Sequence, residues 1–239
     1  MHIPDGLIGS NPFAEVIEHG HEHAHGHIHE LLENSPVGQA IFDPTYQLIF
    51  FAIISIILLI LIFNKYRKNH TEKDIVTIAL FTVAVVIVQL IEIPLPVAAC
   101  AHISLIAVLA LYDLDMSMII FTFVTIIQAF LGEGGISTLG YNLFNLAIIA
   151  PLIAYYVYKL TNKINKNVAL FLSGFITITL LGILVSVEYA LAGTFPLSYG
   201  LTVITSVEAI VGVLEGIVTV FVMNALHKVK PELTPVLNE

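Results

Sequence analysis

The first two residues of the chain, Met1 and His2, have the groups to bind one metal ion together. The terminal amine, the backbone nitrogen of residue 2 and the His2 imidazole close adjacent chelate rings and place three nitrogens in a plane. The amide must lose its proton, which nickel(II) and copper(II) promote and cobalt(II) promotes less readily. Tetragonal nitrogen sites are typical of Cu(II) and Ni(II), whereas zinc prefers a tetrahedron. One corner of the square stays open for a fourth ligand.

This chelate requires a free amine on Met1. Residues 1–12 contain neither the basic region nor the continuous apolar region of a signal peptide, so we expect the chain to keep its own N-terminus. The bulky second residue also favours retention of the initiator methionine, because the enzyme that removes it needs a small residue there. The alternative is that His2 belongs to an untethered tail.

The composition indicates what kind of structure has to position these residues. Of the 239 residues, 57% are hydrophobic and 11% are charged, and the mean hydropathy is +0.93. These values differ from those of soluble domains and indicate a membrane protein. The single cysteine, Cys100, cannot form an intrachain disulfide and leaves the redox compartment open.

Six apolar runs approach the length of about 20 residues that crosses roughly 30 Å of hydrocarbon. They are residues 46–64, 75–93, 116–131, 139–160, 168–189 and 203–226. A seventh run, residues 103–112, has about half that length and can form only part of a crossing.

The Lys and Arg residues fall in three short stretches, 65–73, 159–166 and 228–230. An excess of such residues is typical of cytoplasmic loops, and the three stretches share one face only if 103–112 counts as a crossing. We therefore predict an all-α bundle of seven transmembrane helices, N-terminus outside and C-terminus inside, with one short span that follows a non-helical loop. The predicted parts are an extracellular metal-binding segment (1–45), the transmembrane domain (46–228) and a cytoplasmic tail (229–239).

His102, in the stretch IPLPVAACAHISL, is the candidate for the fourth nitrogen. It lies at the predicted extracellular start of the short run, after Pro94 and Pro96, which prevent a regular helix. Irregular backbone at membrane depth is tolerated where protein covers it or where it lines a cavity, and broken helices build the binding sites of transporters. The alternative role of a lone intramembrane histidine is a hydrogen bond between helices.

A histidine tract, EHGHEHAHGHIHELLEN, precedes the first long run. Its alternating histidines are His19, His21, His23, His25, His27 and His29. Part of the tract matches the H-E-x-x-H signature of metalloproteases, but the glycines of this low-complexity run argue against the stable helix that the signature needs. Neutral imidazoles in series offer exchangeable sites, so we expect an auxiliary segment that gathers metal ions. The alternative is a hydrated acidic loop without a role.

Five polar residues inside the apolar runs are costly in lipid and are expected to face the bundle interior, as support for the site. They are Gln128, Asn142, Asn145, Glu208 and Glu215. Glu208 and Glu215 are seven residues apart and share a helix face. Two roles stay open for them, a hydrogen bond to a ligand imidazole or simple bonding between helices.

Small residues recur at a spacing that lets helices approach closely. Gly212 and Gly216 form a GxxxG pair, and Ala150 and Ala154 form a second small pair. These pairs serve either packing inside the bundle or the docking of a partner. The chain has no G-x-x-x-x-G-K-[ST] motif, so energy from ATP has to come from partners.

The stretches MHIPDG, AACAHISL, QAFLGEGGISTLGYNLFNLAIIAPLIAY and VLEGIVTVFVMNAL occur in this order. Together they resemble the CbiM/NikM family, the cobalt- and nickel-specific substrate-binding components of energy-coupling-factor transporters. The resemblance covers the opening hexapeptide and most of residues 75–228. It implies that the ion is held by the Met1 amine, the amide and imidazole of His2, and His102, and that GEGGISTLG caps the pocket. The histidine tract departs from the family, whose members usually enter their first helix soon after the opening motif.

The same resemblance implies the partners and the location of the chain. The partners are a membrane coupling subunit and cytosolic ABC-type ATPases, with a small accessory membrane subunit as a further candidate. The location is the plasma membrane of a prokaryote, where the chain is surrounded by lipid, and no nucleic acid is expected. The chain is then a transporter component and not an enzyme, and cobalt uptake connects it to cobalamin biosynthesis.

Two functions stay open at this point. The first is the metal-binding component of an ATP-driven importer, with Ni(II) or Co(II) as the transported substrate. The second is a self-sufficient nickel or cobalt permease, which the lack of a membrane-embedded histidine and aspartate pair disfavours. Planar nitrogen coordination favours nickel, but family members with this opening motif serve either ion.

Overall fold

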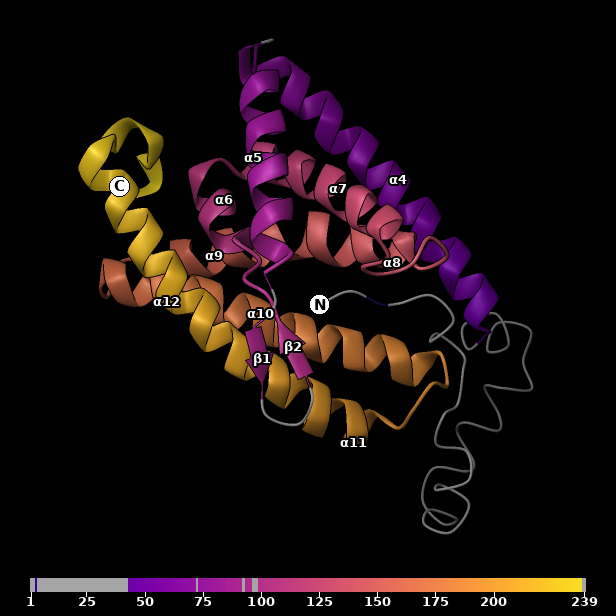
Figure 1. Ribbon diagram of the computed structural model, residues 1–239. Coiled ribbons are helices and arrows are strands. Elements are labelled where there is room, and N and C mark those ends of the chain that lie inside the picture. Colours follow the sequence, from indigo (N-terminus) through magenta and orange to yellow (C-terminus); the bar gives the residue numbers. More distant parts are fainter. Residues whose placement is uncertain (1–2, 4–42, 72, 92, 96–98, 238–239) are drawn as a thin grey trace.

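The structure, a computed structural model, describes Ile3 and residues 43–71, 73–91, 93–95 and 99–237. Met1, His2 and the histidine tract lie outside the described residues, so their predicted roles stay predictions. Figure 1 shows a bundle of helices in which α4 runs along one edge, beside α5 and α7.

The first half of the described chain contains four helices and one small hairpin. The helices are α4 (Pro44–Asn69), α5 (Lys73–Gln89), α6 (Ile106–Tyr112) and α7 (Leu114–Leu131). Between α5 and α6, strands β1 (Ile93–Leu95) and β2 (Ala99–Ala101) pair antiparallel, with Ile93 opposite Ala101.

In the second half, the long apolar runs contain π-helical turns. The order is α8 (Leu139–Asn142), π-helix η2 (Leu143–Ile149), α9 (Ala150–Thr161), α10 (Lys166–Leu191), α11 (Leu197–Tyr199), π-helix η3 (Gly200–Ile204) and α12 (Thr205–Val229). Two 3₁₀ turns follow, η4 (Pro231–Leu233) and η5 (Pro235–Leu237).

Within the described residues, five helical segments are long and apolar enough to cross a membrane, which confirms the predicted helical, multi-pass membrane class. They are Pro44–Lys68, Leu114–Leu131, Leu139–Thr161, Lys166–Leu191 and Leu197–Val229. The apolar part of α5, Asp74–Gln89, is shorter, and α6 has only seven residues. The count of seven crossings and the orientation of the termini stay predictions.

Two predicted segments differ from the helices observed. The run 75–93 continues past the end of α5 at Gln89, and Ile93 is in a strand because the residue before a proline disfavours the α conformation. The run 103–112 starts before α6, which begins at Ile106 after Leu105 adopts the left-handed conformation with φ 60°. The stretch around His102 is therefore non-helical, as predicted.

Polar contacts join the end of α4 to the junction of α6 and α7. Asp113 caps α7 by accepting from the Met116 N–H at 2.8 Å. The other oxygen of the same carboxylate lies 3.0 Å from His70 Nε2, and Lys65 pairs with Asp115 at 2.7 Å. Burial lowers the pKa of His70, but the bond to Asp113 and its charge outweigh burial, so the net shift is upward.

The C-terminal turns pack against the same end of α6. Leu237 and Val236 share an apolar cluster with Leu111 of α6 and Tyr158 of α9, and the Leu237 carbonyl accepts from Lys166 Nζ. One end of α6 is thus approached by three parts of the chain. They are the basic residues in the last turns of α4, the basic residues around the α9–α10 turn and the C-terminal turns. We refer to this end of the bundle as the basic end.

Helices α10 and α12 pack backbone to backbone through glycines (Figure 1). A Cβ on Gly174 would lie 2.8 Å from the Gly216 nitrogen, and one on Gly212 would lie 2.8 Å from the Phe175 carbonyl oxygen. The GxxxG pair of α12 therefore packs inside the bundle. Ala150 and Ala154 are also fully buried, so the second small pair is internal too.

We predict that Gly174→Ala lowers the unfolding temperature of the purified chain by about 5 °C, because the added methyl group meets backbone that cannot shift without separating the helices. Circular dichroism at 222 nm during heating in detergent measures the change. Ala225→Val, at an exposed position of α12, adds bulk without such a contact and should leave the temperature unchanged. Equal unfolding temperatures for Gly174→Ala and wild type would contradict this packing.

Candidate metal-binding site

The backbone of Ile3 is held inside the helix bundle. Its N–H donates to Asn142 Oδ1 at 2.8 Å, and its carbonyl accepts from Asn142 Nδ2 at 3.0 Å and from the Thr138 hydroxyl. The side chain has no exposed surface and packs with Tyr141, among others, in an apolar cluster. We call the contacts of Asn142 and Thr138 with this backbone the Ile3 clamp.

The clamp residues lie in the segment that follows α7. That helix ends at Leu131, and Gly132 caps it by donating its N–H to the Gln128 carbonyl. Gly132 has a φ of 90°, which glycine adopts without strain. The chain then turns into α8, where Thr138 and Asn142 are four residues apart and face the same side. The segment after this glycine-rich turn thus presents two polar side chains to the backbone of Ile3.

His102 lies in the non-helical stretch between β2 and α6 and is partly buried. It lines a hollow of about 10 Å³, close to the space that one water molecule occupies. Gln89, Ser104, Thr125 and Gln128 supply polar groups to the same hollow.

Ser104 fixes the backbone two residues after His102. The Glu215 carboxylate of α12 accepts from the Ser104 N–H and hydroxyl, each at 2.9 Å, and the Ser104 carbonyl accepts from Gln89 Nε2 at 3.0 Å. These bonds hold the turn in which Leu105 adopts its left-handed conformation, which costs a non-glycine residue roughly 1–2 kcal/mol. Glu215 therefore supports the histidine through its backbone.

Gln128 connects this turn to the glycine-rich loop. Its Nε2 donates to Gln89 Oε1 at 2.6 Å and to Glu133 Oε2 at 3.1 Å. Glu133 belongs to GEGGISTLG, the stretch predicted to approach His102. Within the described residues, Gln128 Oε1 and Thr125 Oγ1 are buried without a hydrogen-bond partner. Both residues line the His102 hollow, so two polar atoms without a hydrogen-bond partner belong to its lining residues.

The other predicted support residues, Asn145 and Glu208, are buried against α10. Asn145 Nδ2 donates to Glu188 Oε2 of α10 at 2.8 Å, a bond between helices. Glu208 lies against Gly182 of α10, where a Cβ would approach its side chain to 2.8 Å.

Sequence reasoning missed four residues of these networks. Gln89 and Glu188 carried a detectable signal, because each is a polar residue near the end of an apolar run. Ser104 and Thr138 carried none, since hydroxyl residues are common in transmembrane helices and loops. Their roles depend on partners 111 and 135 residues away in the sequence.

No three His, Cys, Asp or Glu side chains come together within the part of the chain that the structure describes. Buried polar networks that meet at a broken helix inside an apolar bundle define a multi-pass membrane protein of the transporter class.

Comparison with known proteins identifies the family. The model of CbiM, described as the cobalt uptake substrate-specific transmembrane region, matches residues 39–233. The chain belongs to this family. It is a cobalt and nickel transport component of the CbiM type, and its relatives are named as metal transport proteins and not as enzymes.

Two relatives illustrate the match. The chain is 29% identical over 201 residues to a cobalt transport protein CbiM from Thermosipho melanesiensis, covering 80% of this chain and 85% of the relative. It is 34% identical over 105 residues to a putative fused nickel transport protein NikMN from Archaeoglobus fulgidus, covering 42% of this chain and 35% of the relative. One of these relatives is thus named for cobalt transport and the other for nickel transport.

Solved structures share the fold. A transition metal transporter aligns with a TM-score of 0.70 at 25% identity, covering 79% of this chain and 91% of the other. A truncated transition metal transporter aligns with a TM-score of 0.71 at 23% identity, covering 95% and 99% of the two chains.

We predict that Asn142→Ala lowers the affinity of the chain for Ni(II) about 30-fold, because two buried hydrogen bonds to Ile3 are lost at about 1 kcal/mol each. Asn142→Asp keeps the acceptor and loses the donor, so its affinity should fall between the two. Isothermal titration of the purified chain measures the effect. Asn224→Ala, which removes an exposed hydrogen bond to Asn167, is the control and should bind like wild type. Wild-type affinity in Asn142→Ala would show that the clamp does not position a ligand.

Proposed function

We propose that the chain is the substrate-binding membrane component of an energy-coupling-factor importer, and that it holds one Ni(II) or Co(II) ion as substrate. The ion is bound by four nitrogens, which come from the Met1 amine, the amide and imidazole of His2, and the imidazole of His102. The observation that carries this proposal is the Ile3 clamp, because it ties the residue directly after His2 into the interior of the bundle.

The clamp supports this ligand set through its covalent connection to the first two residues. Consecutive Cα atoms are about 3.8 Å apart, so a fixed residue 3 restricts the volume that residues 1 and 2 can reach. The restriction lowers the entropy that the ligands lose when they close around an ion. A histidine elsewhere in an untethered tail has no such advantage.

The turn at His102 supports the fourth ligand in the same way. Glu215 and Gln89 hold the Ser104 backbone from two different helices, so the imidazole approaches the ion from a fixed position. An outer partner that orients a metal ligand commonly changes metal affinity by about 10–100-fold. Glu215 plays this part by binding Ser104, two residues after His102, whereas the role left open by the sequence was a hydrogen bond to the imidazole itself.

We propose nickel as the preferred ion, because a planar set of nitrogens that includes a deprotonated amide suits Ni(II) better than Co(II). The names of the relatives support either ion. Uptake of each ion by cells that contain the partner subunits separates the two, since a nitrogen site binds Ni(II) more tightly than Co(II) whichever ion it carries.

Transport requires partners in this proposal. The chain has no phosphate-binding loop, so we propose that a membrane coupling subunit and cytosolic ABC-type ATPases supply the energy, with a small accessory membrane subunit as a further partner. The histidines at positions 19–29 gather ions at low external concentration. Deletion of residues 18–30 should then reduce uptake of scarce metal while the equilibrium affinity of the purified chain is unchanged.

The ligand set predicts that chain position matters as much as residue type. An alanine inserted between Met1 and His2 moves the imidazole to the third residue, where a terminal chelate no longer needs His102. That variant should still bind nickel but should not support uptake in cells that contain the partner subunits. Acetylation of Met1 and His102→Ala each remove one ligand and should weaken Ni(II) binding by more than about 100-fold.

Isothermal titration of Ni(II) and Co(II) into wild type, the acetylated chain and His102→Ala tests these expectations. His227→Ala is the matched control, because His227 bonds to Thr234 at 2.8 Å near the C-terminus. Near-equal affinities in all four proteins would refute the four-nitrogen site and move the binding to the histidine tract. ATP hydrolysis by the purified chain alone would refute the dependence on partner ATPases.

A further inference from the structure

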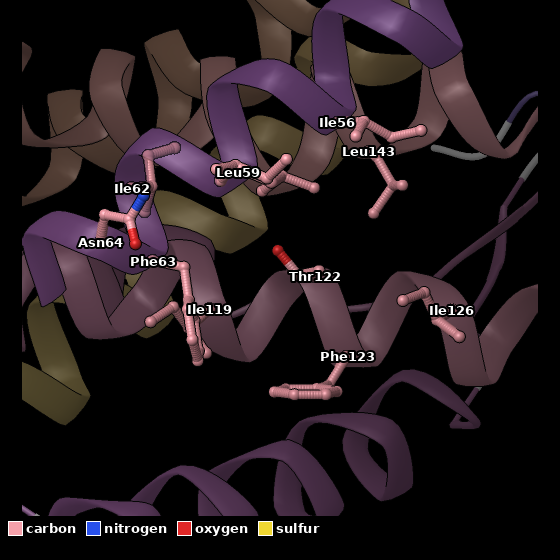
Figure 2. Close-up of a pocket in the computed structure, with 11 residues that line it drawn as sticks. Ile56, Leu59, Ile62, Phe63, Asn64, Ile119, Thr122, Phe123, Ile126 and Leu143 are labelled. Carbon is pink, nitrogen blue, oxygen red and sulfur yellow. The ribbon is translucent and has the colours of Figure 1, made fainter. Parts of the chain in front are cut away.

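An apolar hollow of about 380 Å³ lies between α4 and α7, and His102 is not among the residues that line it. Figure 2 shows the side chains of α4 and α7 that line it, with Thr122 pointing toward α4. Most of the lining is aliphatic or aromatic, and Thr122 and Asn64 are the polar residues among those that line it. The hollow has room for flexible hydrocarbon.

A second hollow, of about 440 Å³, continues the first toward the basic end of the bundle. The two share Phe63, Ile119 and Phe123, so they adjoin along these three residues. Its far end is lined by Arg67 and His70, where α4 meets α5. We call the two hollows together the α4–α7 groove.

The length of the groove corresponds to one leaflet of a bilayer. From Ile56 to Arg67 along α4 there are 11 residue steps, which rise about 16 Å in a helix. Half of the roughly 30 Å hydrocarbon core is about 15 Å. The apolar part of the groove thus runs from the middle of the predicted membrane to the level at which headgroups begin.

The charge at the end of the groove favours an anion. Among the described residues, three acidic side chains at this end are each bound by a neighbour: Asp115 by Lys65 at 2.7 Å, Asp113 by His70 at 3.0 Å and Asp74 by the Thr71 N–H at 2.8 Å. Among the described residues, the exposed guanidinium of Arg67 has no salt-bridge partner. A planar guanidinium at this position is suited to bind a phosphate group through two hydrogen bonds.

The rest of the chain covers little of α4, so the groove beside it is open to an occupant. Within its apolar window only 11% of the residues are buried in the chain, compared with 56% for α7. The open side of the groove therefore faces the surroundings of the bundle and not its core.

We propose that the α4–α7 groove is a binding site for one anionic phospholipid of the leaflet at the basic end. One acyl chain fills the apolar part between Ile56 and Phe123, and the phosphate binds Arg67. The lipid then forms part of the packing that joins α4 to α7.

Native mass spectrometry of the full chain in neutral detergent tests this site, with dioleoylphosphatidylglycerol and dioleoylphosphatidylcholine as competing probes. We expect one retained phosphatidylglycerol per chain and a preference of about fivefold over phosphatidylcholine, the effect of one basic side chain near an anionic headgroup. Arg67→Gln should abolish the preference. Thr122→Phe should fill the apolar part and reduce the retention of both lipids.

Matched controls separate the site from ordinary lipid contact. Lys163→Gln removes an exposed charge elsewhere, and Val83→Phe adds bulk at an exposed position of α5 that does not line the groove. Both should retain lipid like wild type, and Ni(II) titration should show that all four variants bind metal as wild type does. Equal retention of the two lipids by wild type, or unchanged retention in Arg67→Gln and Thr122→Phe, would overturn the proposal. Weaker co-purification of a partner protein with both variants, together with unchanged lipid retention, would overturn it in favour of a protein occupant.

Discussion

The proposed site depends on the backbone of one buried residue near the start of the chain, Ile3. The N–H and the carbonyl of Ile3 are both satisfied by Asn142, with a further bond from Thr138. A buried peptide that lacked these partners would cost about 1–3 kcal/mol for each unpaired group, so the clamp decides whether this segment enters the bundle. Ile3 is joined to Thr138 and Asn142, which lie 135 and 139 residues later in the sequence, so this residue is part of the core.

Two independent supports converge on the proposed site. Ile3 is held from the segment after α7, whereas His102 is held through Ser104 by Glu215 of α12 and Gln89 of α5. The supports come from different helices, so a movement of either one would change the distance between the opening residues and His102. The π-helix η2 begins directly after Asn142, and π-helical turns occur frequently at functional sites.

Sequence reasoning recovered the features that depend on local pattern. The apolar runs predicted the helices, Pro94 and the short run predicted a non-helical stretch at His102, and the small residues of α12 predicted close helix packing. Pairings between distant segments were not predictable, because nothing near Asn142 or Glu215 indicates that they bind the backbone of Ile3 and of Ser104. The left-handed conformation of Leu105 was equally hidden, since leucine has no preference for it and only the surrounding bonds enforce it.

The central claim is that the clamped N-terminus and His102 bind one ion together. Diffraction from crystals of the nickel-loaded full chain, measured at the nickel absorption edge, locates that ion directly. The account predicts a single anomalous peak in a square of nitrogens from Met1, His2 and His102, with both hydrogen bonds between Ile3 and Asn142 retained. A peak among the histidines of residues 19–29, or an ion at His102 without Met1 and His2, would contradict it.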